Sequence, residues 1–205
     1  MGLSADQLRT SLDALAAIEP AIAAAVARAG YPQPRIRERG YATLLRTIVG
    51  QQVSVAAAQS IWNKLEAGLG DLDDPATIAR SDLESLRTFG LSRQKGSYAL
   101  SLADEVTSGR LDLANLPEGD EEAIAQLVRI KGIGRWSAEI YLLFAEGRAD
   151  VWPAGDLAVQ VEIGRLLGMK DKPTEKQLRE IAEAWRPHRG AAAILAWHSY
   201  NSAVL

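Results

Sequence analysis

An aspartate that follows a tight turn and opens a helix is the residue of this sequence best placed to do chemistry. Asp156 stands in "VWPAGDLAVQVEIGRLLG", after Pro-Ala-Gly and ahead of residues with helical apolar spacing. The positive end of a helix favours a negative charge. A carboxylate there can stabilise positive charge in a transition state and can position or deprotonate a water molecule. Taken alone, Asp156 equally fits the simpler role of a helix N-cap, and one residue can fill both roles.

A second stretch, "LVRIKGIGRWSAEIYLLFA", has the residue types of an anion-binding turn between two helices. Gly132 and Gly134 permit a tight turn whose amide groups point outward, with an exposed Ile133 between them. The next helix is expected to begin at about Arg135, which would place its positive end beside those amides. Lys131 and Arg135 add charge, so the turn suits a phosphate diester. A plain helical hairpin that uses two glycines is the alternative for a bare Gly-x-Gly.

The composition narrows the class of protein that could hold these two features. With 205 residues and 47% hydrophobic residues, the chain can build one large domain or two small ones. It has no cysteine, which excludes disulfides and thiolate metal sites. The polar first residues and the absence of a long apolar run predict a cytoplasmic protein. The net charge is −3, so a nucleic-acid partner would need a local basic face.

Nearly all of the chain has the signals of helices and none of strands. Apolar residues recur with 3.6-residue spacing, and short Pro/Gly/Asp segments separate roughly ten helices. Three pairs have capping-box spacing ahead of apolar runs, namely Ser4 with Gln7, Ser81 with Glu84, and Thr174 with Gln177. Four glycines stand where helices should end: Gly30, Gly70, Gly90 and Gly168. The predicted fold class is all-α.

The longer motifs resemble one family. The hairpin pattern resembles the helix-hairpin-helix of the DNA glycosylase superfamily that includes endonuclease III. "GIGRWSAEIYLLFA", "DVWPAGDLAVQ", "AEAWRPHRGAAAILAWHSY", "IVGQQVSVAAAQSI" and "GLSRQKGSYALSLA" together resemble bacterial DNA-3-methyladenine glycosylase II. This resemblance extends from about Tyr41 to the C-terminus. It implies a two-lobed helix-hairpin-helix glycosylase fold with the active site in the cleft between the lobes.

The resemblance also implies a division of the chain. Residues 1–40 would form N-terminal helices that pack with the C-terminal lobe, residues 41–148 a middle helical lobe ending in the hairpin, and residues 149–205 the C-terminal lobe with the catalytic aspartate. Longer family members carry an additional N-terminal mixed α/β domain, where this chain has a short helical segment.

The implied reaction is release of an alkylated purine, such as 3-methyladenine or 7-methylguanine, from DNA by hydrolysis. Asp156 matches the catalytic position, where a carboxylate stabilises the oxocarbenium-like sugar. Many relatives have a second acidic residue at the position of Gly155. Bifunctional members carry a Schiff-base lysine where this chain has Trp136, so we expect a monofunctional glycosylase without lyase activity.

Aromatic residues are expected to form the pocket for the extruded base. Trp136 and Trp197 match family pocket positions, and a cationic alkylpurine stacks well on tryptophan. We also assign Tyr141, one helical turn beyond Trp136, to this pocket. The family's pocket tyrosines fall at Ile140 and Leu157 here, which leaves the substrate range open. For any single tryptophan the alternative is core packing, which we expect for Trp62, Trp152 and Trp185.

The remaining contacts are expected with double-stranded DNA that contains a damaged base; for the basic residues Arg93 and Lys95 the alternative is a solvated helix start. Gln52 occupies the position of the side chain that fills the gap left by the extruded nucleotide, and its alternative role is simply to follow a helix end. The expected backbone contacts come from the hairpin and from a nearby helix: Lys131, Gly132, Ile133, Gly134, Arg135, Ser137, Arg93 and Lys95. Arg186 and Arg189 are further candidates near the C-terminal helix.

No cofactor is expected, apart from a structural monovalent cation that the family implies at the carbonyls of Val128, Ile130 and Ile133. We expect a monomer without membrane contact that acts in the bacterial cytoplasm, at the nucleoid. Two alternatives remain open. One is a glycosylase of the same fold for deaminated or oxidised bases, and the other is a non-enzymatic helix-hairpin-helix DNA-binding module.

Overall fold

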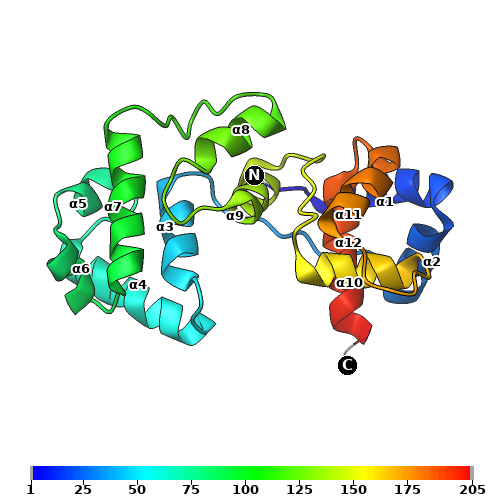
Figure 1. The fold of residues 1–205 in the computed structure, drawn as a ribbon, viewed down its shortest axis with the longest axis horizontal. Coiled ribbons are helices and arrows are strands. Elements are labelled where there is room, and N and C mark those ends of the chain that lie inside the picture. Colours follow the sequence, from blue (N-terminus) through cyan, green and yellow to red (C-terminus); the bar gives the residue numbers. More distant parts are fainter. Residues whose placement is uncertain (1, 204–205) are drawn as a thin grey trace. The chain divides into compact units, whose positions relative to one another are not determined.

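The computed structural model describes residues 2–203, and the regular secondary structure within this range is entirely helical (Figure 1). The expected all-α class is therefore confirmed. The chain divides into two compact units. One unit contains the described residues up to Arg37 together with those from Leu142 onward, and the other is Glu38–Tyr141. The sequence analysis placed the divisions a few residues later, after residues 40 and 148.

Helix α7 is the centre of the Glu38–Tyr141 unit, where it packs against α3, α5 and α6 (Figure 1). Helix α9 contacts both α3 and α8. The helices of this unit are α3 (Tyr41–Gly50), α4 (Val55–Leu69), α5 (Pro75–Ala79), α6 (Leu83–Thr88), α7 (Arg93–Thr107), α8 (Asp120–Leu127) and α9 (Arg135–Tyr141).

Helix α12 is the centre of the other unit, where it packs against α1, α2 and α10. Its sequence, rich in alanine, is buried along most of its length, which allows the three neighbouring helices to approach closely. The elements of this unit are α1 (Ala5–Ile18), α2 (Pro20–Ala29), the π-helical turn η1 (Leu142–Glu146), α10 (Leu157–Leu166), α11 (Glu175–Ala182), the 3-10 turn η2 (Glu183–Trp185) and α12 (Arg189–Ala203).

Two of the three expected capping boxes are confirmed, at the starts of α1 and α11. The expected box at Ser81 is wrong, because α6 begins one residue later and Asp82 is its N-cap, accepting a hydrogen bond of 2.7 Å from the amide of Ser85. An aspartate caps a helix as well as a serine does. The hydroxyl of Ser81 instead donates to the carbonyl of Thr77. All four glycines expected to end helices have positive φ, between 65° and 102°.

The helical run that begins with α9 continues without a break into η1, and the division between units falls inside this run, between Tyr141 and Leu142. Turn η1 is buried against its own unit. The carbonyl of Phe144 accepts a hydrogen bond of 2.8 Å from the amide of Arg37. A side chain at Gly190 would lie 2.6 Å from Leu143, so η1 also packs closely on the start of α12.

Trp62, Trp152 and Trp185 are each no more than 3% exposed, which confirms the expected core positions. The rings of Trp152 and Trp185 meet edge to face with their centroids 5.7 Å apart. None of the helices among the described residues has the length and apolar character needed to cross a membrane.

Candidate functional site

The side chain of Asp156 is fixed at the N-terminus of α10 by two donors. It is the N-cap of the helix, and its Oδ1 accepts a hydrogen bond of 3.0 Å from the amide of Val159. The same oxygen accepts a second bond of 3.0 Å from the indole Nε1 of Trp197 on α12. The residue is half-buried. The carboxylate is thus held at the positive end of a helix of ten residues, where negative charge is favoured.

Hydrogen bonds also hold the turn that precedes Asp156. The amide of Ala154 donates to the carbonyl of Trp152 at 2.8 Å, and the amide of Asp156 donates to the carbonyl of Pro153 at 3.0 Å. The side chain of Gln160 donates from Nε2 to the carbonyl of Ala154 at 2.8 Å. Because both the turn and the carboxylate are held, the acidic group has a defined direction.

Trp197 is 8% exposed, and other groups already surround its ring. Phe144 on η1 lies with its centroid 5.5 Å away at an interplanar angle of 57°. The guanidinium of Arg35 lies over the ring, 5.3 Å from the centroid. The sequence analysis expected only stacking on a base from Trp197. Its bond to Asp156 was missed, because no local spacing links residues 41 positions apart in the chain.

The other two aromatic residues assigned to the base pocket lie on α9 and differ in exposure. Trp136, in the first turn, is 46% exposed, which leaves a large apolar surface on the outside of its unit. Tyr141 is 2% exposed, and its hydroxyl accepts a hydrogen bond of 2.9 Å from the amide of Gly40, so its ring belongs to the core. Ile140 is buried, whereas Leu157, next to Asp156, is 65% exposed.

The hairpin between α8 and α9 uses its two glycines for different purposes. Gly132 has φ +86°, and a Cβ there would lie 2.1 Å from the ring of Tyr98, so only glycine fits. The carbonyl of Gly134 accepts the first hydrogen bond of α9, 3.0 Å from the amide of Ala138. Gly134 is therefore the N-cap, and it has no side chain to cover the first amides of the helix. A Cβ at Gly134 would meet nothing within 4 Å.

The expected start of the helix at Arg135 is confirmed. The expected exposure of Ile133 is wrong: the side chain is 3% exposed. An isoleucine between the two glycines holds the turn on the core of the unit, because burying its apolar surface stabilises that position. The hairpin therefore presents backbone to solvent and keeps its one large side chain inside. Ser137 is half-buried on the first turn of α9.

The loop after α3 is joined to the hairpin through Gln51. Its Nε2 donates a hydrogen bond of 2.8 Å to the carbonyl of Gly132. The next residue, Gln52, is exposed and has φ +54°, the one non-glycine residue with positive φ among residues 2–203. The amide of Lys131 donates to the hydroxyl of Ser101 on α7. The loop, the hairpin and α7 are thus tied into one surface of the Glu38–Tyr141 unit.

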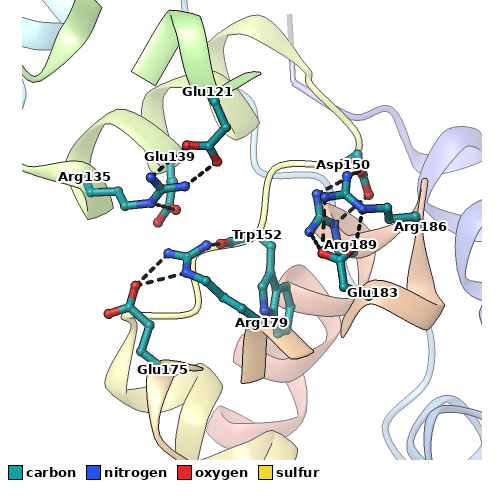
Figure 2. A network of polar contacts seen from close by, with 10 residues as sticks. All are labelled: Glu121, Arg135, Glu139, Asp150, Trp152, Glu175, Arg179, Glu183, Arg186 and Arg189. Atoms are coloured by element: carbon teal, nitrogen blue, oxygen red, sulfur yellow. Dashed lines mark hydrogen bonds and ion pairs between the residues drawn. The ribbon is translucent and has the colours of Figure 1, made fainter. Parts of the chain in front are cut away.

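The basic residues of this surface do not all present their charge outward. Arg135 donates to Glu121 at 2.9 and 2.5 Å and to Glu139 at 2.9 Å (Figure 2). Glu139 is 1% exposed, and the hydrogen bonds that Arg135 donates to Glu121, together with the charges of both acids, raise the pKa of Arg135. The charge of Arg135 is therefore largely balanced inside the protein, where it links α8 to α9.

Lys95, another expected phosphate contact, donates from Nζ to the carbonyl of Val49 at 2.8 Å, at the end of α3. Burial lowers the pKa of its ammonium group. Lys131 and Arg93 are exposed. The sequence analysis found these basic residues, but the spacing of the residues did not show which of them would be engaged by the protein itself.

Arg186 and Arg189, like Arg135, form ion pairs with carboxylates of the protein. Both join Asp150 and Glu183 in one network (Figure 2). Arg189 is 8% exposed and binds both oxygens of Asp150 at 2.9 Å. This bidentate pair secures the start of α12 to the segment after η1.

No group of three or more His, Cys, Asp or Glu side chains suited to a metal ion exists in the described part of the chain. The two histidines form structural hydrogen bonds, His188 with Ser11 and His198 with the carbonyl of Ala29. At the hairpin, the carbonyl of Ile130 accepts a bond of 3.0 Å from the amide of Ile133. A carbonyl oxygen has two lone pairs, so this bond does not prevent it from also facing a cation.

The hairpin between α8 and α9, which presents its backbone to solvent within an all-α fold, is typical of helix-hairpin-helix proteins. The chain matches the model for the HhH-GPD superfamily of base excision DNA repair proteins over residues 45–187, and it belongs to that superfamily.

Individual relatives agree with this assignment. DNA-3-methyladenine glycosylase 1 of Schizosaccharomyces pombe is 33% identical over 78% of this chain and 72% of its own length. The chain spans 58% of the length of a Bacillus subtilis relative that is 28% identical.

Solved structures of related proteins share the fold. A DNA-3-methyladenine glycosidase from Bacillus halodurans is 32% identical, with a TM-score of 0.78 over 84% of this chain and 80% of its own. The 3-methyladenine DNA glycosylase of S. pombe in complex with abasic DNA is 30% identical, with a TM-score of 0.77 over 96% of this chain and 97% of its own.

Proposed function

We propose that the chain is a monofunctional DNA glycosylase that hydrolyses the N-glycosidic bond of alkylated purines, of the 3-methyladenine and 7-methylguanine type, in base excision repair. The observation that carries the proposal is the carboxylate of Asp156, held at the N-terminus of α10 by Trp197. Support for the substrate class comes from the relatives, whose names identify them as DNA-3-methyladenine glycosylases. Double-stranded DNA with one damaged base is the partner of this reaction, and the chain acts on it as a monomer at the bacterial nucleoid.

The proposed chemistry needs one fixed negative charge. As the bond between C1′ and the purine nitrogen breaks, the electron pair leaves with the base and the sugar becomes cationic. Asp156 stabilises that cation, and water then forms the new bond at C1′ and releases its proton to the carboxylate or to solvent. An alkylated purine already carries positive charge and leaves as a neutral base, so no general acid is required.

The remaining assigned residues act before this step. Trp136 offers a half-exposed indole on which a cationic base can stack. Gln52 is exposed at the tip of a turn, where it can fill the gap left by the extruded nucleotide. The first amides of α9 and the charge of Lys131 suit a backbone phosphate. The carbonyls of Val128, Ile130 and Ile133 would hold a monovalent cation that supplies positive charge beside that phosphate.

The absence of lyase activity is part of the proposal, since Trp136 has no amine with which to form an imine. The products are expected to be a free base and an unbroken strand with an abasic site. Borohydride treatment during the reaction should trap no covalent complex between protein and DNA. A trapped complex, or a strand nick that appears without alkali, would contradict this part alone.

A base-release assay tests the proposal. DNA treated with a simple methylating agent is compared with duplexes that contain uracil or 8-oxoguanine, using the parent chain and Asp156→Asn. The expected result is release of methylated purines by the parent and none by the variant, which should still bind DNA. Release only from the uracil or 8-oxoguanine duplex would assign a different lesion. DNA binding without base release from any of the duplexes would favour the alternative of a non-enzymatic DNA-binding module.

A further inference from the structure

Two arginines near Trp197, the residue that donates to Asp156, have no acidic partner among residues 2–203. Arg35 and Arg37 lie in the segment that links α2 to α3, and neither forms an ion pair with any of residues 2–203. Other arginines of the same unit are paired with carboxylates, three of them in Figure 2: Arg28, Arg165, Arg179, Arg186 and Arg189. Acidic residues outnumber basic ones in this chain, 26 to 23, so a shortage of acids does not explain why Arg35 and Arg37 lack an acidic partner.

The two guanidinium groups lie on neighbouring aromatic rings. Arg35 lies over Trp197, 5.3 Å from the ring centroid, and Arg37 lies over Phe144 at 5.8 Å. The two rings are 5.5 Å apart. Trp197 donates to Asp156, so Arg35 is separated from the proposed catalytic carboxylate by a single side chain.

The backbone of this segment is held in place although it has no regular secondary structure. The amide of Arg37 donates to the carbonyl of Phe144 at 2.8 Å. The N-terminal segment also packs closely here, where a Cβ on Gly2 would lie 2.6 Å from the carbonyl oxygen of Phe144 and 2.8 Å from that of Arg35. Both side chains are exposed at their positions. The segment therefore presents two cations from a fixed backbone.

An anion would reduce the electrostatic cost of this arrangement. Contact with the protein removes water from the Arg37 guanidinium, and the nearby charge of Arg35 repels it, so both effects lower the pKa of Arg37. Positive charge next to Asp156 would also oppose the cationic sugar of the proposed reaction, because like charges repel. Both costs are removed if an anion binds to the pair at the moment when the substrate is in place. A nucleotide in DNA has a phosphate on each side.

We propose that Arg35 and Arg37 bind the DNA backbone phosphates that flank the nucleotide attacked at Asp156. The inference rests on the proposed function, since it takes the anion from the substrate. The planar guanidinium suits a phosphate, and the aromatic rings beneath limit its rotation before binding. Through these contacts the pair positions the extruded nucleotide, while its charge is neutralised by the strand that carries the lesion.

The test is the salt dependence of DNA binding. The probe is a labelled duplex with one tetrahydrofuran analogue of an abasic site, and Kd is measured from about 50 to about 200 mM KCl. Removing one arginine that binds a phosphate should lower the slope of log Kd against log salt concentration by about 0.9. Across this fourfold range the salt-induced loss of affinity becomes about 3.5-fold smaller for Arg35→Gln or Arg37→Gln, and about 12-fold smaller for the double variant.

Two controls separate a phosphate contact from a structural role. Arg35→Lys keeps the charge and should keep the parent slope, whereas a structural role for the stacked guanidinium predicts that lysine fails as glutamine does. Arg87 on α6, exposed and paired with Glu84, supplies a matched change, and Arg87→Gln should leave the slope unchanged. Thermal unfolding of every variant is measured alongside.

A slope for the double variant equal to that of the parent would overturn the inference. An equal fall for Arg87→Gln would do so too, because the effect would then come from net charge alone. The result is independent of catalysis. If the parent releases no base from methylated DNA but the slope falls as expected, the proposed function fails and the phosphate contact remains.

Discussion

The hydrogen bond from Trp197 to Asp156 gives the sharpest prediction about the site. Trp197→Phe removes the indole N–H and keeps an aromatic ring against Phe144 and Arg35. Oδ1 of Asp156 would keep the hydrogen bond from the amide of Val159 but lose the one from the indole, so the carboxylate would be held less firmly in its present direction.

The magnitude follows from the kind of bond that the substitution removes. Hydrogen bonds to charged groups contribute about 1.5 to 3 kcal/mol. If that energy serves to direct the carboxylate in the transition state, the rate of base release should fall about 10- to 150-fold. The complete loss expected of Asp156→Asn sets the lower limit of activity. Folding should weaken by only about 1 to 2 kcal/mol, because Asp156 is half-buried and its carboxylate can bond to water instead.

The assay is single-turnover release of methylated purines with protein in excess, which excludes product dissociation from the measured rate. Trp62→Phe is the matched control. Its indole is 3% exposed, and its Nε1 has no hydrogen-bond partner among residues 2–203, so the same change there removes no bond. A parent-like rate for Trp197→Phe, or an equal fall for Trp62→Phe, would refute the reasoning.

Three further predictions concern the turns that frame the site. Asp156→Ala should lower the free energy of unfolding by about 1 kcal/mol through loss of the N-cap, whereas Asp156→Asn should not; chemical denaturation of both variants measures the difference. Gly132→Ala should destabilise the protein by about 2 kcal/mol or more, since its Cβ would meet the ring of Tyr98 at positive φ. Gly134→Ala has open space and should cost no more than about 1 kcal/mol, the difference between glycine and alanine at an N-cap, so it should melt above Gly132→Ala; the opposite order of melting temperatures would contradict both expectations. Gln52→Gly should raise stability by up to about 1 kcal/mol, because it relieves the positive φ, yet slow base release; unchanged activity would exclude Gln52 as the inserted side chain.

Local signals in the sequence predicted the helices and most of their ends. Ser4 and Thr174 were found because a capping box is complete within four residues. Ser81 was chosen wrongly, since Asp82 is an equally good cap one residue later and the pattern cannot rank the two. The start of α9 at Arg135 followed from the hairpin glycines.

The same local signals could not predict contacts between residues that lie far apart in the sequence. The bond from Trp197 to Asp156, and the position of Arg35 over the same ring, depend on how α10, α12 and η1 pack. The expectation that Ile133 would be exposed failed for a related reason: its neighbours are glycines, and whether the side chain turns inward depends on the core that receives it.

The sequence did not show that the charge of Arg135 is paired within the protein. Arg135 has the position of a phosphate contact, but Glu139 is one helical turn away and Glu121 lies on the preceding helix. Only the fold brings Glu121 within reach, so the sequence could show the cation without showing how far it is balanced.

The internal balance of Arg135 bears on how a repair protein searches a genome. With a net charge of −3 on the chain, and with this hairpin cation already paired with two carboxylates, Arg135 should add little to the binding of an intact duplex. Dwell times on normal sequence should be short and turnover between sites fast. The dwell time would lengthen only where a nucleotide leaves the helix. Discrimination between damaged and normal DNA would therefore begin with the rate of dissociation from normal sequence.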